Sequence, residues 1–486
     1  MVKYSILAGL LLAFVGVKTL FTPASVPVFQ PPPQAQRLVE TPRLVFTPTS
    51  TYEEVGWRKI PDFHLPDKFV LVLQAARSTT DKECIPLRKG FTQLHYTILS
   101  DEERRKLPPQ RQAVMLGANF FTDAGFSFCN FNKGYLDPFA DSDEKFVKHV
   151  RGFDANYGIV VYDLENVPWK PVKYERDGFR QKTYLSPNSP GFKVPDNQFV
   201  EAYKQAMARK YLLMVKTLKK EKSMPFTLIG TYSPGSPSEN FHGRLDYPNA
   251  FTDPSFKQWI WDYSVGGEVF HQYCDIQTPG SYFRITGEEH PKSWLYQLLL
   301  DQEVNAAWSK LPRIPVQWLF YTNNENKAIS PQMAEGTAIF NIMTGAKGIW
   351  LWDRGNYITP QKTPTIIGQD GQTYQLRNYS SYEYFMAGLY RLSKHNDLLV
   401  KDYQVVIPEI STDNGQTFKA LNAAESRRGD KPVARALVAG NEVLIAACNP
   451  LAGVNDRTTL VVRYGKWKDQ IVLKGNEVYL GRARFQ

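Results

Sequence analysis

Short apolar runs alternate with helical stretches along most of the chain, and this alternation restricts the possible folds more than any other feature. Continuous apolar runs of about four to eight residues are typical of strands that helices cover on both faces. The runs are 69–73, 91–98, 113–121, 158–162, 226–231, 268–274, 315–321 and 347–352. Helices are predicted at 141–151, 199–218, 293–309, 331–344 and 381–399. This order predicts an α/β fold, a (β/α)8 TIM barrel, although a doubly wound sheet would give a similar pattern.

The pattern changes near residue 401, where short strands follow one another with few residues between them. They are predicted at 434–439, 442–448, 458–464, 470–474 and 477–481, with Gly440-Asn441 and Gly475-Asn476 as hairpin turn signals. We therefore expect the barrel at 56–400 and a small all-β sandwich domain, packed on it, at 401–486.

The N-terminus has the features of an export signal. Lys3 precedes an apolar run, Ile6 to Val17, which fits a secretory segment and is short for a membrane span. Residues 1–21 are therefore predicted to be a signal peptide or an uncleaved membrane anchor. The proline-rich residues 22–55 are predicted to be a stiff linker. We expect an exported protein, secreted, periplasmic or on the cell surface, that meets the membrane only through such an anchor.

Charge and cysteine content exclude several classes of function. The net charge is +10, but the basic residues are scattered, and the densest group closes the helix at 199–218, where cations complement the helix dipole. No nucleic-acid motif is present, so we expect no nucleic-acid partner. The four cysteines show no metal-binding spacing, and we predict neither a metal site nor a cofactor. Cys84 with Cys129 is the one disulfide that we consider.

Two carboxylates mark the end of the fourth predicted strand, in the segment Tyr-Gly-Ile-Val-Val-Tyr-Asp-Leu-Glu-Asn at 157–166. Active sites of such barrels lie at the carboxyl ends of the strands. Asp163 and Glu165 are two residues apart, so in an extended chain they project on the same side. Repulsion between them would raise one pKa and supply a protonated acid beside a charged stabiliser, as glycosidic cleavage requires.

This Asp-x-Glu strand end resembles the fourth-strand signature of family 18 glycoside hydrolases, which include chitinases and endo-β-N-acetylglucosaminidases. The resemblance implies that Glu165 is the general acid. It implies that Asp163 orients the substrate's N-acetyl group, whose carbonyl oxygen attacks the anomeric carbon. The segment at 272–275, with Tyr273 and Asp275, is similar to the family's sixth strand.

The segment at 348–353 resembles the last strand of that family, whose Trp forms the floor of a sugar subsite. Trp350, Trp352 and Asp353 are the corresponding candidates for contacts with a glycan. Tyr162 and Tyr232, each at the end of a predicted strand, are further candidates.

Two alternatives remain open. Glu165 could be the acid/base of a retaining glycosidase whose nucleophile is Glu325, which follows the seventh predicted strand next to the substrate-binding candidate Asn323. The chain could also be a non-catalytic glycan-binding or surface-assembly protein on a degenerate barrel. The second alternative is favoured by the absence of two acids that precede Asp-x-Glu in family 18, and of that family's Gly-Gly on the third strand. In each case we expect the partner to be a polysaccharide or another glycan.

Overall fold

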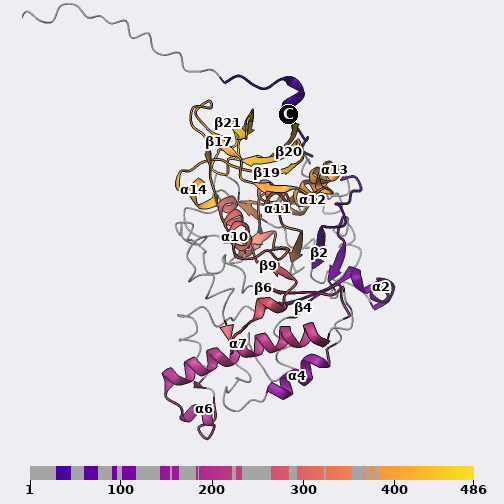
Figure 1. Ribbon diagram of the computed structural model, residues 1–486, viewed down its shortest axis with the longest axis vertical. Helices are drawn as coiled ribbons and strands as arrows, with labels where there is room; N and C mark the ends of the chain where they lie inside the picture. The colour runs from indigo at the N-terminus through magenta and orange to yellow at the C-terminus, as the bar shows by residue number, and fades with distance from the viewer. Residues whose placement is uncertain are drawn as a thin grey trace, which may run out of the picture.

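The computed structural model describes residues 29–44, 60–74, 90–95, 101–116, 143–153, 156–163, 182–183, 185–221, 226–232, 264–283, 293–321, 324–352, 365–367, 373–375 and 380–485. Figure 1 shows the antiparallel strands of the C-terminal part at one end of the long axis and helix α7 (Asp196–Glu221) toward the other. No helix in these ranges is both long enough and apolar enough to cross a membrane.

An eight-stranded parallel sheet forms the barrel, as predicted. The strands are neighbours in chain order, and the last, β13, pairs with the first, β2. They are β2 (Val70–Gln74), β3 (Gln93–His95), β4 (Gln112–Leu116), β5 (Ile159–Asp163), β6 (Leu228–Tyr232), β9 (Ile276–Thr278), β10 (Val316–Gln317) and β13 (Gly348–Trp352). This cyclic order excludes the doubly wound sheet, whose strand order reverses.

The gap between β9 and β10 is closed by isolated parallel bridges rather than by a continuous ladder. Gln277 bridges to Arg313, and Gly280 to Val316. The Ile314 N–H donates to the Gln277 carbonyl at 2.8 Å, which joins the two strands directly. The barrel therefore closes, through separate bridges at this seam.

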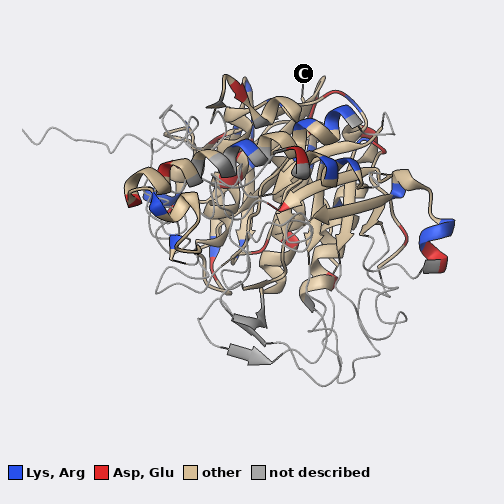
Figure 2. Cartoon of the chain, turned by 90° about the horizontal axis from the view of Figure 1, so that it is seen from below, with Lys and Arg blue, Asp and Glu red and all other residues tan. Residues whose placement is uncertain are grey.

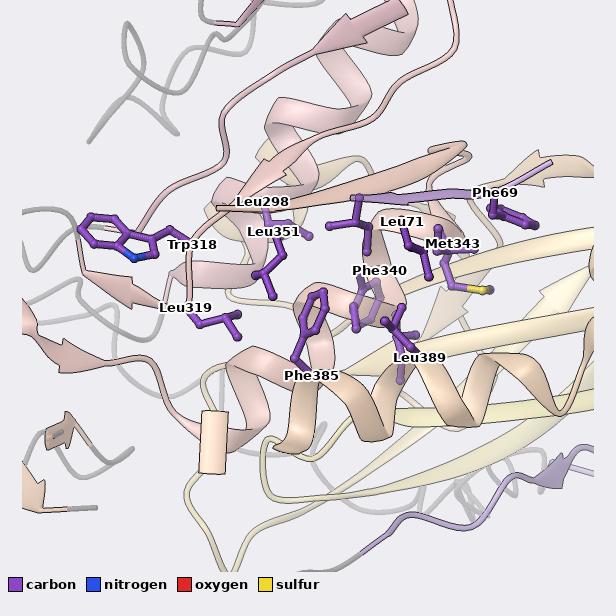
Figure 3. Packing of buried hydrophobic residues seen from close by; sticks show 14 of the residues in the cluster. Phe69, Leu71, Leu298, Trp318, Leu319, Phe340, Met343, Leu351, Phe385 and Leu389 are labelled. Carbon is purple, nitrogen blue, oxygen red and sulfur yellow. The ribbon is translucent and has the colours of Figure 1, made fainter. Parts of the chain in front are cut away.

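The barrel interior is a small apolar cluster to which the strands contribute alternate residues. Its buried members are Val72, Ala113, Ile159, Val161, Tyr232, Ile276, Ile314, Val316 and Trp350. The residues between them point outward, where helices cover them. The larger core lies between the barrel wall and α10 (Trp294–Trp308), α11 (Pro331–Met343) and α12 (Ser380–Ser393) (Figure 3).

The sixth barrel strand lies later in the chain than predicted. The apolar run at 268–274 forms β8 (Glu268–Val269), in a hairpin with β7 (Ser264–Val265), and the 3-10 helix η8 (Phe270–Tyr273). The true strand, β9, includes the buried Gln277, whose side chain points toward α10 and donates to the Asn305 carbonyl. Because Gln277 interrupts the apolar pattern, β9 is not recognised as an apolar run.

Two other predicted elements are divided. The run at 315–321 contributes β10 to the barrel, whereas β11 (Phe320–Tyr321) joins a separate sheet with β12 (Asn324–Ala328), β14 (Thr365–Ile367) and β15 (Thr373–Gln375). The helix at 381–399 is two helices, α12 and α13 (Asn396–Leu399). The remaining short elements of the barrel region are α2 (Asp101–Lys106), η6 (Pro109–Arg111), α4 (Asp143–Arg151) and α6 (Pro190–Lys193).

The C-terminal part is a sandwich of two antiparallel sheets, as predicted. The inner sheet has the order β1-β23-β20-β19-β16, and the outer sheet has the order β18-β17-β21-β22. The inner strands are β1 (Val39–Glu40), β16 (Gln404–Val406), β19 (Val433–Ala439), β20 (Glu442–Cys448) and β23 (Tyr479–Arg484). The outer strands are β17 (Glu409–Ser411), β18 (Lys419–Ala420), β21 (Arg457–Tyr464) and β22 (Trp467–Lys474), and helix α14 (Ala423–Arg428) lies beside α10.

Gly440-Asn441 turns β19 into β20, as predicted, but Gly475-Asn476 connects strands of different sheets. The hairpin of the outer sheet turns at Gly465, whose φ of 58° lies in the left-handed region that glycine adopts readily. Every residue of β19 and β20 is buried. One face of these strands packs on the outer sheet, and the other joins the core of α10, α11 and α12.

Part of the proline-rich segment, which we expected to be a linker, packs on the sandwich. We call residues 29–44, with 3-10 helix η1 (Gln34–Gln36), the N-terminal strap. Its strand β1 pairs with β23, Val39 opposite Arg482. On the other side, the Leu38 N–H donates to Asp469 at 2.6 Å and the Trp467 indole donates to the Gln36 carbonyl at 2.8 Å. The strap therefore closes one open edge of the sandwich.

A buried ion cluster joins the strap, the barrel helices and the sandwich. Glu335 of α11, 1% exposed, accepts hydrogen bonds from Arg391 of α12 at 2.5 Å and from Arg43 of the strap at 2.6 Å. Arg391 also donates to the Thr41 carbonyl at 2.8 Å and to the Val478 carbonyl at 2.9 Å. Burial is the main cause that lowers the pKa of Arg391, and the Glu335 carboxylate opposes it. Arg43 also forms an ion pair with Glu477 at 2.6 Å, so each charge in the cluster has a partner of opposite sign.

Replacing Glu335 with Gln is expected to lower the free energy of unfolding by about 3–5 kcal/mol, because the fully buried Arg391 guanidinium loses its counter-charge, whereas Arg43 keeps Glu477. Urea denaturation measures the change. Glu102→Gln on α2 is the control, since its ion pair with Lys106 is exposed, and it should have little effect. Equal losses for the two variants would contradict the importance of the cluster.

A single carboxyl group is buried behind the seam of the barrel. Asp301 of α10 is 1% exposed and lies beside Ser281, to which the neighbouring Gln302 amide donates at 3.4 Å. Burial raises the pKa of Asp301 well above its ordinary value, and the interaction with Ser281 opposes this shift only in part. The protonated form is therefore the one that the fold favours.

Because the raised pKa belongs to the folded state, Asp301 should cost stability as pH rises from the ordinary carboxyl pKa toward the raised value. Asp301→Asn removes this titration. Over that range, the stability of the variant relative to wild type should increase by about 1.4 kcal/mol per pH unit. Thermal or urea unfolding between pH about 4 and 7 measures it. If the free energy of unfolding depends on pH in the same way for wild type and variant, Asp301 ionises normally.

Candidate functional site

Asp163 lies at the carboxyl end of β5, on the rim of the barrel. Ile159 and Val161 of the same strand belong to the interior cluster, so Asp163, two residues further, projects to the same side. The Asp163 side chain is half-buried. Its predicted partner Glu165 lies outside the described residues. Of the two carboxylates, the structure therefore places Asp163 alone.

Neighbouring strands bring two more polar side chains to the same level of the rim. Asp163 is opposite Tyr232 in the β5–β6 register, and Tyr232 is opposite Thr278 in the β6–β9 register. Tyr232 is a member of the interior cluster and 3% exposed, and Thr278 is 1% exposed. The rim thus carries a carboxylate, a phenol and a hydroxyl on three successive strands.

An aromatic wall continues from Tyr232 along the rim. We use this name for Tyr232, Tyr282, Trp318 and Trp352. The Tyr232 and Tyr282 rings are 5.9 Å apart, and Tyr282 stacks on Trp352 at 5.6 Å. Trp352 meets Trp318 edge-on at 4.7 Å. Trp318 is 2% exposed and belongs to the packed core, at the edge of the cluster that Figure 3 shows. Tyr282 and Trp352 are partly exposed, so the wall offers ring surface at the rim.

Beneath the rim, a layer of hydrogen bonds fixes the barrel floor. Trp350 is fully buried, and its indole N–H donates to the Gln74 side chain at 2.5 Å. The His95 ring lies edge-on to Trp350 at 6.1 Å, and its Nε2 accepts from the Met115 N–H at 3.1 Å. Burial lowers the pKa of His95 to about 3, so this imidazole is neutral at physiological pH. Trp350 therefore supports the site from below rather than offering a free face.

Tyr162 points away from the rim, contrary to the role proposed for it. It follows Val161 on β5 and so faces outward, where it is fully buried in the core under the helices. Burial raises the pKa of its phenol well above the ordinary value. A side chain on this face of the strand has no access to a ligand in the barrel mouth.

Tyr273 and Asp275 lie at the opposite end of the barrel from Asp163, because the sixth strand begins only at Ile276. Asp275 forms an ion pair with Lys219 of α7 and accepts from the Ile229 N–H at 3.1 Å. The Tyr273 phenol donates to Glu268 at 2.6 Å. These contacts secure α7 and the loop before β9, and the structure does not bring the two residues to the rim.

The other predicted residues are placed only in part. Glu325 belongs to strand β12, which pairs antiparallel with β11, rather than to a loop. Its side-chain position is outside the described part of the structure, and so are Asn323, Asp353, Cys84 and Cys129. Cys274 and Cys448 are buried thiols that are not part of a disulfide. Within the described ranges, no group of three or more His, Cys, Asp or Glu side chains is placed to hold a metal ion.

Sequence reasoning missed four residues of the rim and floor. Gln74 directly follows the first apolar run, and Trp318 follows Val316 by two residues, so strand alternation could have identified both. His95 was interpreted as part of an apolar strand. Tyr282 follows the displaced sixth strand, and its position could not be found while 268–274 was taken as that strand.

No protein-family model and no curated protein sequence matches this chain. Among solved structures, bee venom hyaluronidase in complex with a hyaluronic acid tetramer is 14% identical, with a TM-score of 0.39 over 60% of this chain and 93% of its own. A GH18 chitinase from Pseudoalteromonas aurantia is 12% identical, with a TM-score of 0.32 over 59% and 97%. A noncanonic maltogenic alpha-amylase from Thermotoga neapolitana is 10% identical, with a TM-score of 0.32 over 86% and 100%.

These scores are too low for the likenesses to assign a fold, a family or an activity. The barrel is established by its own strand order, register and closure. The function has to be inferred from the rim residues.

The aromatic wall depends on a glycine that follows β9. A Cβ added to Gly280 would lie 2.5 Å from the Tyr232 ring and 2.7 Å from its hydroxyl oxygen. Gly280→Ala should therefore displace Tyr232 and reduce stability by about 1–3 kcal/mol, as overpacking does. In a Tyr232→Ala background the same change should cost little, and a double-mutant cycle measured by urea denaturation tests this.

Gly152→Ala is the matched control, because its added Cβ would meet no atom closer than 3.4 Å. The role of Gly280 would be disproved if its substitution cost as much without the Tyr232 ring as with it.

Proposed function

We propose that this protein is an exported glycoside hydrolase that cleaves N-acetylhexosamine-containing glycans by substrate-assisted catalysis. The observation that carries the proposal is the position of Asp163 at the carboxyl end of the fourth barrel strand, on the inner side. Glu165 follows two residues later, in the Asp-x-Glu order of family 18. Export is inferred from the apolar run at 6–17 behind Lys3.

In this mechanism Glu165 is the general acid. It donates its proton to the glycosidic oxygen as the bond to the anomeric carbon breaks, and the acetamido carbonyl oxygen forms the new bond to that carbon. Asp163 accepts a hydrogen bond from the acetamido N–H and stabilises the positive charge that develops on the ring so formed. Glu165, now a carboxylate, then takes a proton from the water that opens this ring.

The aromatic wall supplies the binding surface that this chemistry needs. The C–H groups on one face of a pyranose are apolar, and they pack against aromatic rings such as those of Tyr282 and Trp352. Tyr232 is the end of this wall nearest to Asp163, because it is opposite Asp163 in the β5–β6 register and 5.9 Å from Tyr282. A sugar stacked on the wall would place its substituents next to the carboxylate. Trp352 therefore keeps the role that the resemblance implies, and Trp350 supports it.

The test compares variants on two oligosaccharides, one of N-acetylglucosamine and one of glucose. Glu165→Gln should reduce cleavage of the acetamido sugar by about 10²–10⁴-fold, with binding retained. Asp163→Asn should also lose most activity, and Glu325→Gln should lose little. Reducing-end release measures the rate, and calorimetric titration measures binding.

Glu325→Gln is the control that separates the mechanisms. If it abolishes turnover and the glucose oligomer is cleaved, the protein is a retaining glycosidase with Glu325 as nucleophile, and the acetamido mechanism is wrong. If wild type binds glycans of either kind but cleaves neither, the barrel is a binding protein.

A further inference from the structure

The outer sheet of the sandwich presents a cationic surface that none of the chemistry above uses. Residues along β22 are alternately buried and exposed. Trp467, Asp469, Ile471 and Leu473 face the inner sheet, whereas Lys468, Gln470, Val472 and Lys474 face outward and are exposed. The outward side of β22 is therefore accessible along its whole length, whereas Val461 of the neighbouring β21 is buried.

Four exposed cations belong to this hairpin, and we call them the outer-sheet cations: Arg457, Lys466, Lys468 and Lys474. Arg457 and Lys474 are opposite each other in the register, and Lys466 is in the turn. Within the described ranges, none of the four forms an ion pair. Two exposed valines lie among them, Val472 at 44% and Val454 at 74% exposed.

The acidic groups nearby are already engaged. Glu409 pairs with Arg463 of the same sheet at 2.6 Å, and Asp469 points inward, where it accepts from the Leu38 N–H. Asp456 accepts from the Gly453 N–H at 2.6 Å. The outer-sheet cations thus give this face a net positive charge.

The N-terminal strap begins at this same face. The ring of Phe29, the first described residue, lies 5.5 Å from the Lys468 ammonium, and the strap then crosses β22 to reach β23. Figure 1 shows the strap and the sandwich together at one end of the molecule, opposite α4, α6 and α7. Residues 18–28 separate Phe29 from the apolar run at 6–17, and they can span at most about 40 Å when fully extended.

We propose that the outer sheet is a membrane-docking surface that binds anionic lipid headgroups while the apolar run at 6–17 enters the bilayer. The strap places the outer-sheet cations within reach of that bilayer. Their charge complements anionic lipids, and Val454 and Val472 add apolar contact at the interface. The barrel is then held above the membrane by the sandwich, whatever its activity.

Each cation near an anionic surface increases membrane affinity by about fivefold, so the four together should contribute about 600-fold, and salt should weaken this contribution. The full-length protein is mixed with vesicles of phosphatidylcholine alone and with vesicles in which about one third of the lipid is phosphatidylglycerol. The ratio of the two partition coefficients, measured by flotation, isolates the cationic surface from the apolar segment, which enters both kinds of vesicle.

Wild type should prefer the anionic vesicles by about 600-fold at low salt. Replacing all four outer-sheet cations with Gln should bring the ratio close to one, and replacing the three lysines with Arg should preserve it. The matched control replaces Arg105, Lys148, Lys193 and Lys220 with Gln. These exposed residues are on α2, α4, α6 and α7, helices whose basic residues Figure 2 shows in blue.

The control has the same net charge as the quadruple variant but should keep the preference. The proposal is overturned if both variants lose it equally, which would indicate an effect of total charge. It is also overturned if wild type partitions equally into both vesicles, or binds a soluble anionic polysaccharide such as heparin without preferring anionic lipid. Unchanged circular dichroism confirms that the exposed substitutions leave the fold intact.

Discussion

The ion cluster around Glu335 is the constraint on which the arrangement of the whole molecule depends. Glu335 and Arg391 are both almost fully buried, so separating them would leave two uncompensated charges in the core. Because the members of the cluster come from α11, α12 and the strap, and because Arg391 also binds the carbonyl of Val478, the cluster links the barrel helices to the sandwich at a fixed point. The apolar core around it supplies the driving force for docking but no comparable directional preference.

At the barrel mouth, the residues that support the site differ from those that stand at its surface. Floor residues such as Trp350 and His95 are buried and hydrogen-bonded, whereas Asp163 and Trp352 stand at the strand ends with part of their surface exposed. A rigid floor limits the movement of the residues above it, which matters because catalytic groups act only within a narrow range of positions. The large aromatic content thus fills the barrel below and, in the function proposed here, supplies the binding surface above.

Much of the fold could be predicted because its strands obey simple patterns. The runs that became β2, β5 and β13 are apolar throughout, since helices cover one side and the barrel interior the other. β9 could not be found in this way, because Gln277 makes its contacts in a buried polar layer that no local pattern reveals. Asp163 was found from its place after an apolar run. Tyr162, beside it, was misassigned because only the strand's orientation in space decides which of two neighbours faces the mouth.

The pairing of the strap has a consequence for the order in which the chain acquires its structure. Val39 pairs with Arg482, so the strap has to wait for a segment that is synthesised much later. Contacts this distant in sequence carry a large loop-closure cost and form late. The sandwich edge that the strap closes is therefore among the last parts of the domain to be completed.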